Sequence, residues 1–454
     1  MPQSQPHTAP LFVLPFYGYA AISLLVSLGL LWWSVPNLDG HFFQPKLLGI
    51  VHLMALGWGT MMILGASHQL LPVLLGNALY SHKLAMSSFV LAALGIPFLV
   101  VRFLQFQMDV WALAGAAGII FAIIAFFINL LQSMRQQPQK DVHIWFMLAA
   151  TIWLLLTMLL GWLLLYNFSH PILPNNSLHY LSLHAHIGLA GWFLLLVMGV
   201  GSRLIPMFLI AQVNDNKTLW HIFLVMNASL LLFVIVFCLA MPLPWLAAPF
   251  AGIVFSMLLF ANYIRHAYRL RVRKSIDTPM KLSLVSVLLM LLPSLLLAAV
   301  LLLQTTASGA AITSLVKLYG FLLFFGWLST LIIGMTFKTL PFIVWSQHYS
   351  KAATTKQHIN PNDLVQHTTV KYMMLLYVTG LLLFACSMLL QILWGLHLAA
   401  SHHAGGRSAV YLACVSNDCS PTCKMICTPS LPTDPITAPK QWSNFTPYSI
   451  RKWE

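Results

Sequence analysis

The sequence contains very few acidic residues. Its 454 residues include 23 Lys and Arg but only 9 Asp and Glu, and charged residues make up 7% of the chain. The single glutamate is the last residue, Glu454, and the aspartates fall in predicted loops or in the C-terminal tail. No predicted membrane span therefore carries a carboxylate, which excludes the usual buried acid of a membrane proton relay.

Cysteine patterns that bind metal or attach haem are also missing. Four of the six cysteines lie in residues 401–454, and their spacing matches neither a CxxC zinc site nor a CxxCH haem-attachment site. We expect residues 401–454 to be a disordered tail rich in Cys and Pro, because they contain no spanning run and cannot bury a core. Residues 1–10 lack a basic segment and the first apolar run has spanning length, so we expect no cleavable signal peptide. The distribution of loop charges predicts that residues 1–10 are a cytoplasmic N-terminal segment.

Apolar residues, in contrast, are abundant. They make up 59% of the chain, and the mean hydropathy is +0.83. This balance is typical of a polytopic membrane protein, so we predict an all-α transmembrane helix bundle over residues 11–400. The eleven apolar runs of spanning length lie near 11–35, 47–75, 84–104, 110–134, 143–166, 180–210, 219–240, 244–264, 282–303, 314–345 and 371–398.

The basic residues are concentrated in alternate loops. The loops after the second, fourth, sixth, eighth and tenth predicted spans hold 15 Lys and Arg, whereas the other loops hold only Lys46, Arg102 and Lys317. This bias predicts a cytoplasmic N-terminus, because positive loops stay inside. It also accounts for the net charge of +14, so we expect the lipid bilayer, and no nucleic acid, as a partner.

Three of the predicted spans repeat one pattern. Counted from His52, His186 and Phe321, each has Gly at +5, Trp at +6, Gly at +13, a polar residue at +17 and Pro at +20, and the copies start 134 and 135 residues apart. These fixed offsets indicate an internal repeat of four-helix units around a pseudo-threefold axis. The matching residues are Gly57, Trp58, Gly65, Gln69 and Pro72; Gly191, Trp192, Gly199, Arg203 and Pro206; and Gly326, Trp327, Gly334, Lys338 and Pro341.

Three histidines lie at one depth of these repeated spans. His52 and His186 occupy the same repeat position, and His184 is two residues away from His186. Because histidine inside a bilayer usually faces the bundle interior, two such imidazoles are suited to axial ligation of one haem iron. The alternative is a set of interior histidines bonded to backbone or water. The repeat alignment favours His186 over His184 as the partner of His52; the other histidine would serve a second cofactor or bond within the bundle.

The remaining histidines receive other interpretations. His68 follows His52 by sixteen residues, which is about 24 Å along a helix, so we place it at the membrane interface. We expect His143, His221 and His266 to be surface groups at the same end of the bundle as His68.

The other repeated positions also have structural explanations. The small side chains of Gly57 and Gly191 would let a neighbouring helix, or a flat macrocycle, approach the backbone. We interpret the repeated tryptophans as core residues. The residues at +17, which are Gln69, Arg203 and Lys338, we interpret as polar groups that reach the interface.

The arrangement of these histidines resembles subunit I of the haem-copper oxidases. That superfamily includes cytochrome c oxidases, quinol oxidases and nitric oxide reductases, and its pattern is twelve helices in three arcs of four. The spacing of His52, Gly57, Gly65 and Pro72, and of His186, Gly191 and Arg203, is most similar to the NnrS-like branch. The resemblance implies a b-type haem, a bacterial inner-membrane location, NO or O₂ as a gas ligand, and an electron-donor subunit. Copper would be a second metal.

The sequence departs from the oxidase pattern at the metal sites. Residues 317–344 contain no histidine, although the oxidases have two in the equivalent helix. His184 and His186 are followed four residues later by Gly188 and Ala190, so the His-x-x-x-Tyr motif is missing, as is the His-His pair of the next span. A twelfth span is not visible. The usual copper site is therefore not supported, and an oxidoreductase activity does not follow from the motifs.

These observations leave three hypotheses. The leading one is a haem-binding inner-membrane protein that functions in redox chemistry or nitric oxide handling. The second is the catalytic subunit of a terminal oxidase or nitric oxide reductase. The third is a haem-free transporter, in which the repeat is only a scaffold.

Overall fold

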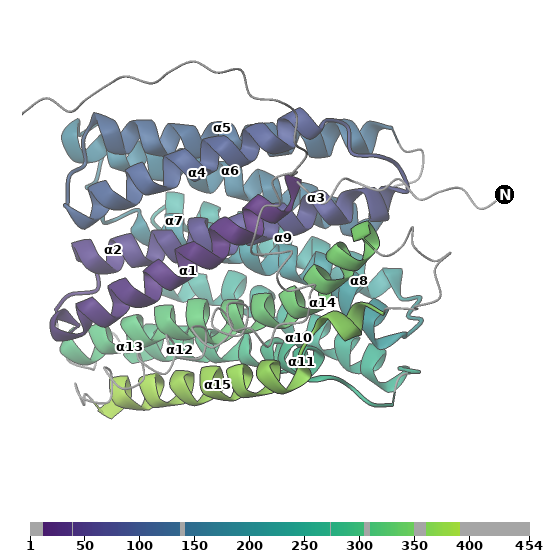
Figure 1. Cartoon of the computed structure of the whole chain (residues 1–454). Coiled ribbons are helices and arrows are strands. Elements are labelled where there is room, and N and C mark those ends of the chain that lie inside the picture. Colours follow the sequence, from purple (N-terminus) through teal and green to yellow (C-terminus); the bar gives the residue numbers. More distant parts are fainter. Residues whose placement is uncertain are drawn as a thin grey trace, which may run out of the picture. The chain divides into compact units, whose positions relative to one another are not determined.

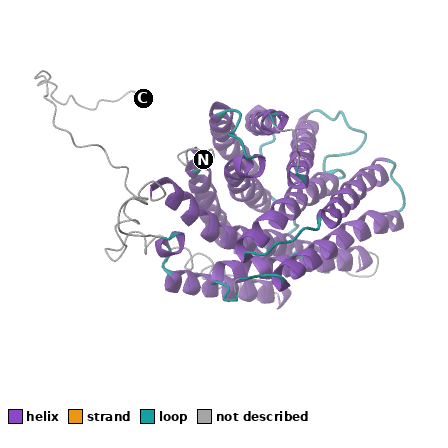
Figure 2. Cartoon of the chain, turned by 90° about the vertical axis from the view of Figure 1, so that its right-hand side faces the viewer, coloured by secondary structure: helices purple, strands orange, loops and turns teal. Residues whose placement is uncertain are grey.

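The computed structural model describes residues 12–390, apart from 39, 137–140, 273, 304–308 and 349–359. Expectations for residues 1–10 and 401–454 lie outside this part of the chain. The regular elements of the described part are helices, as Figure 2 shows, and eleven of the continuous helical segments are long and apolar enough to cross a membrane. The prediction of an all-α polytopic bundle with eleven spans is confirmed.

The helices follow one another with short connections. Their bounds are α1 (Leu14–Ser34), α2 (Pro45–His52), η3 (Leu53–Thr60), α3 (Met61–Leu75), α4 (His82–Leu104), α5 (Val110–Arg135), α6 (Val142–Ser169), α7 (Leu181–His186), η4 (Ile187–Leu194), α8 (Leu195–Leu209), α9 (Asn216–Cys238), η5 (Leu243–Leu246), α10 (Ala247–Arg269), α11 (Thr278–Leu289), α12 (Leu291–Leu303), α13 (Gly309–Phe321), η6 (Leu322–Leu328), α14 (Ser329–His348), η7 (Pro361–Leu364) and α15 (His367–Leu390).

Each repeated span contains a π-helical segment at the same place. The segments η3, η4 and η6 begin one residue after His52, His186 and Phe321, the three positions from which the repeat is counted. A π-helix is rare and often marks a functional site. Three at one repeat position support the internal repeat at the level of the backbone.

The three repeated spans form the centre of the bundle. The most apolar windows of Pro45–Leu75, Leu181–Leu209 and Ala311–Ser346 are 67, 67 and 78% buried, whereas those of the other spans are 22–44% buried. Figure 1 shows α2, α7 and α13 towards one end of these spans and α3, α8 and α14 towards the other. The three positions from which the repeat is counted are His52, His186 and Phe321, and we call them the anchors. They therefore share one end of the bundle interior.

The repeated glycines at +13 explain how each central span packs on its own unit. A Cβ on Gly65 would lie 2.7 Å from Cβ of Phe16 on α1. A Cβ on Gly199 would meet Phe146 on α6, and one on Gly334 would meet Ser283 on α11. Glycine is required at these crossings because no side chain fits between the helices.

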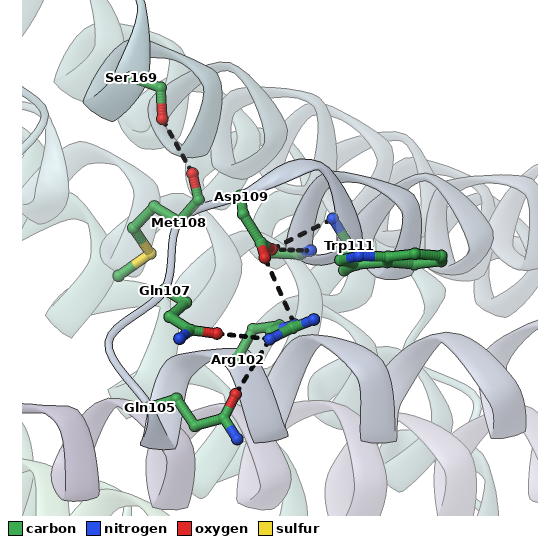
Figure 3. A network of polar contacts seen from close by, with 8 residues as sticks. Arg102, Gln105, Gln107, Met108, Asp109, Trp111 and Ser169 are labelled. Carbon is green, nitrogen blue, oxygen red and sulfur yellow. Dashed lines mark hydrogen bonds and ion pairs between the residues drawn. The ribbon is translucent and has the colours of Figure 1, made fainter.

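Described aspartates lie at helix starts rather than inside spans. Asp109, Asp141, Asp215 and Asp277 accept backbone N–H groups at the N-termini of α5, α6, α9 and α11. Figure 3 shows the first of these: Asp109 accepts from Trp111 and Ala112 at 3.1 Å and forms an ion pair with Arg102 at 3.6 Å. These carboxylates stabilise helix ends.

The interfacial interpretation was wrong for three polar residues. His68 is fully buried and lies against the rings of Phe16 and Phe126, with centroids 5.5 and 5.2 Å away. His143 is also buried and bonds Asp141 through Nδ1 at 2.7 Å. The Lys338 side chain is 8% exposed and forms an ion pair with Asp277. His221 and His266 are exposed, as predicted.

Candidate functional site

A cavity of about 610 Å³ lies among the three repeat units. Helices α2, α4, α5, α6, α7, α12, α13 and α15 all contribute to its wall, which is mostly apolar. His52, His184 and His186 line it, and Lys317 is the one Lys or Arg among its described lining residues. Lys317 donates to the backbone carbonyls of Leu38 and Gly40. The volume is in the range of a pocket for a cofactor-sized ligand.

The imidazole rings of His52 and His184 are neighbours in the lining of this cavity. Their ring centroids are 6.3 Å apart, and the ring planes differ by 19°. The rings are too far apart for direct stacking contact. Two imidazoles bound on opposite sides of one metal, with metal–nitrogen bonds of about 2 Å, would have ring centres about 6 Å apart. The spacing of the centroids therefore matches that of two imidazoles that share one metal through Nε2.

Hydrogen bonds determine which nitrogen each histidine can offer. Nδ1 of His52 donates to the Leu48 carbonyl at 2.8 Å, and Nδ1 of His184 donates to the Thr157 carbonyl at 3.1 Å. A carbonyl only accepts, so in the neutral ring the lone pair is on Nε2. A backbone carbonyl on the far nitrogen is the usual support of a metal-binding histidine.

Two neighbours that the sequence did not identify position these rings. Gly161 on α6 lies against His184, and a Cβ there would be 2.7 Å from Cε1 of the imidazole. Phe103 on α4 packs edge-on against His52, with centroids 4.6 Å apart. No sequence motif contains Gly161 or Phe103, because both come from spans outside the repeat pattern.

His186 does not take part in this pair. Its ring lies 6.1 Å from that of Tyr319, with planes 23° apart, and Nδ1 donates to the Ser182 carbonyl at 2.7 Å. Its buried Nε2 has no hydrogen-bond partner among the described residues. The structure thus brings His52 to His184, whereas the repeat alignment favoured His186.

The repeat explains this arrangement. His52 and His186 occupy the anchor position, and His184 and Tyr319 lie two residues before the anchors of the following units. The His186–Tyr319 pair is therefore the pseudosymmetric copy of the His52–His184 pair. Both histidine anchors meet the −2 position of the next unit, because neighbours around a threefold axis contact through different helix faces.

Gly57 and Gly191 lie outside the cavity lining. A Cβ on Gly57 would be 2.6 Å from Oγ of Ser23, and one on Gly191 would be 2.7 Å from Cβ of Trp153. Of the two explanations for these glycines, the structure supports close helix packing rather than contact with a macrocycle.

The ligand count discriminates between kinds of metal site. Within the described ranges, no group of three or more His, Cys, Asp or Glu could hold a metal ion. A bare zinc or copper ion would therefore lack ligands. A haem supplies four equatorial nitrogens of its own and needs only axial groups. The His52–His184 pair and the apolar wall around it fit a haem.

Comparison of the chain with protein-family models gave no match, and comparison with curated proteins gave none either.

Proposed function

We propose that the protein is a haem-binding membrane redox protein, with His52 and His184 as the axial ligands of one haem. The 6.3 Å separation of two nearly parallel imidazoles in an apolar cavity is the observation that carries this proposal. Of the candidates from the sequence, His184 replaces His186 as the partner of His52.

The chain's own residues would hold the haem and exclude water from it. A haem with two imidazole ligands transfers single electrons. The Leu48 and Thr157 carbonyls fix the rings, and Phe103 covers His52 on one side. Both axial positions would be filled by protein, so electron transfer is the function that this pair supports best.

The location and partners follow from the resemblance and the charge bias. We place the protein in the bacterial inner membrane with a cytoplasmic N-terminus, and with an electron-donor subunit as its partner. Supply of electrons for NO or O₂ handling, the context of the NnrS-like branch, would be its physiological role. Copper is not part of the proposal, because the described residues offer too few ligands.

The test is haem binding by purified protein expressed with excess haem. We expect one haem per chain and a six-coordinate reduced-minus-oxidised spectrum. His52→Ala and His184→Ala should each abolish that spectrum, whereas His186→Ala and the exposed-site control His221→Ala should retain it.

Two other outcomes are informative. Loss of the spectrum in His186→Ala but not in His184→Ala would support the pairing given by the repeat alignment. Wild-type protein without haem would contradict the proposal and favour the haem-free transporter.

A further inference from the structure

One outward face of α10 changes from apolar to cationic along its length. Phe255, Leu258, Asn262, Arg265 and Arg269 follow one another at steps of three and four residues, so they form a stripe on one side of the helix. All five are exposed, Phe255 at 52% and Leu258 at 50%. The stripe therefore presents apolar side chains first and guanidinium groups last.

Further cations extend the end of this stripe. His266 and Lys274 are exposed, and Arg271 lies on the ring of Tyr268 with its guanidinium carbon 4.0 Å from the centroid. Arg265 bonds only a neutral group, Oδ1 of Asn262, at 2.7 Å. Among the described residues, none of these arginines forms an ion pair with a carboxylate.

Two acids flank this cluster. Asp277 follows Lys274 by three residues and forms an ion pair with Lys338. Asp215, at the start of α9, has a pKa that is lowered chiefly by its hydrogen bond with Thr218 and to a lesser extent by His266. Asp215 is engaged in capping α9 through the Thr218 N–H. The cluster as a whole keeps a large excess of positive charge.

We propose that this face binds an anionic phospholipid. The acyl chains would lie along Phe255 and Leu258, and the phosphate would be held by Arg265 and Arg269. Leu258 and Arg265 are seven residues apart, about 10 Å along the helix, which places tail and headgroup contacts at different depths. Clusters of Lys and Arg at the end of a membrane helix attract anionic headgroups.

The surroundings favour a lipid over a soluble partner. The apolar windows of the spans Leu243–Arg269 and Thr278–Leu303 are the least buried of the eleven, at 22% each. Tyr268 at the same level is typical of a residue at the headgroup boundary. A soluble anionic partner would use the cations but leave the apolar half of the stripe uncovered.

The test compares two lipids with the same acyl chains. Delipidated protein is titrated with phosphatidylglycerol or phosphatidylcholine, and bound lipid is counted by native mass spectrometry. We expect phosphatidylglycerol to bind at least tenfold more tightly. The triple variant Arg265→Gln, Arg269→Gln, Arg271→Gln should lose at least tenfold in affinity, since each cation contributes about fivefold.

The matched control removes the same charge from another repeat unit: Lys46→Gln, Lys83→Gln, Arg135→Gln. It should retain the wild-type affinity within about twofold, because attraction to a distant charge is screened. Equal binding of both lipids, or an equal loss in the control, would overturn the proposal. Haem content is not a readout here, so the outcome is independent of the proposed redox function.

Discussion

Trp192 donates its indole N–H to Oγ1 of Thr60 at 3.1 Å, and this bond joins two repeat units. Trp192 is at +6 of the second unit and Thr60 at +8 of the first. Trp58, at +6 of the first unit, donates to Oγ of Ser329, at +8 of the third, at 2.9 Å. Two links of a cyclic set are thus present in the buried centre.

The third link of this set is missing. Trp327, at +6 of the third unit, has a buried Nε1 without a hydrogen-bond partner in the described part of the chain. The +8 residue of the second unit is Leu194, which has no acceptor. An unmade buried bond costs free energy, so this junction lacks a stabilising bond that the other two have.

Two matched substitutions test the effect of this difference. Trp192→Phe and Trp327→Phe remove the same volume from fully or nearly fully buried sites. Trp192→Phe also breaks a bond and leaves the Thr60 hydroxyl oxygen without its donor, whereas Trp327→Phe removes an N–H that has no partner among the described residues. We expect Trp192→Phe to be the less stable variant by about 1–2 kcal/mol. Equal unfolding free energies in detergent would show that the bond contributes nothing.

Gly161 should control haem binding without direct contact with iron. An Ala side chain there would displace the His184 ring from its present position, because its Cβ would lie 2.7 Å from Cε1 of the ring. We expect Gly161→Ala to reduce haem per chain at least tenfold while the protein remains folded. Gly18→Ala is the control, since a Cβ at Gly18 meets nothing within 4 Å. Full haem occupancy in Gly161→Ala would contradict the assignment of His184.

The sequence was sufficient to predict the spans and the repeat. Runs of apolar residues predict membrane helices well, since the bilayer sets both length and composition. The repeat offsets identified the three central spans, which are the most buried in the structure. The π-helical turns were not predictable, because widening one turn leaves hydropathy unchanged.

The site was predictable only in part. The level of His52, His184 and His186 followed from the repeat, but the pairing did not, because an alignment matches equivalent positions and not the faces that meet. The burial of polar side chains at helix ends was not predicted either, because it also depends on which helix faces meet. Lys338 is near the end of its span, yet Asp277 and the ring of Phe208 cover its ammonium group.

The Lys338–Asp277 pair should behave as a buried ion pair. The side chains are 8% and 14% exposed, so Lys338→Met leaves a largely buried carboxylate without its partner. We expect a loss of about 3–5 kcal/mol in unfolding free energy. Adding Asp277→Asn should restore part of it, because Asn caps a helix about as well as Asp and carries no charge.

The control for this experiment is an exposed ion pair. Arg102→Met removes the ion-pair partner of Asp109 (Figure 3). The Asp109 side chain is 38% exposed, so the loss should cost less than about 1 kcal/mol. A Lys338→Met variant as stable as Arg102→Met, or a double variant less stable than Lys338→Met, would contradict the burial argument.

Asp141 gives the stability a defined dependence on pH. Its hydrogen bond with His143, which lies at the start of α6, is the main cause that lowers the pKa of this carboxyl below its ordinary value of 3.8. A carboxyl with a depressed pKa in the folded state stabilises the fold fully above its unfolded pKa, and this contribution is lost as the pH falls through the folded pKa. Asp141 should therefore add nothing to the pH dependence between pH 5 and pH 7, and its contribution to stability should be lost only below about pH 4.

Thermal unfolding of wild type and Asp141→Asn between pH 3 and pH 7 measures this contribution. The variant should be less stable than wild type at pH 7, and the difference in stability should shrink in acid. A difference that stays constant down to pH 3 would show that the charge of Asp141 does not stabilise the folded protein.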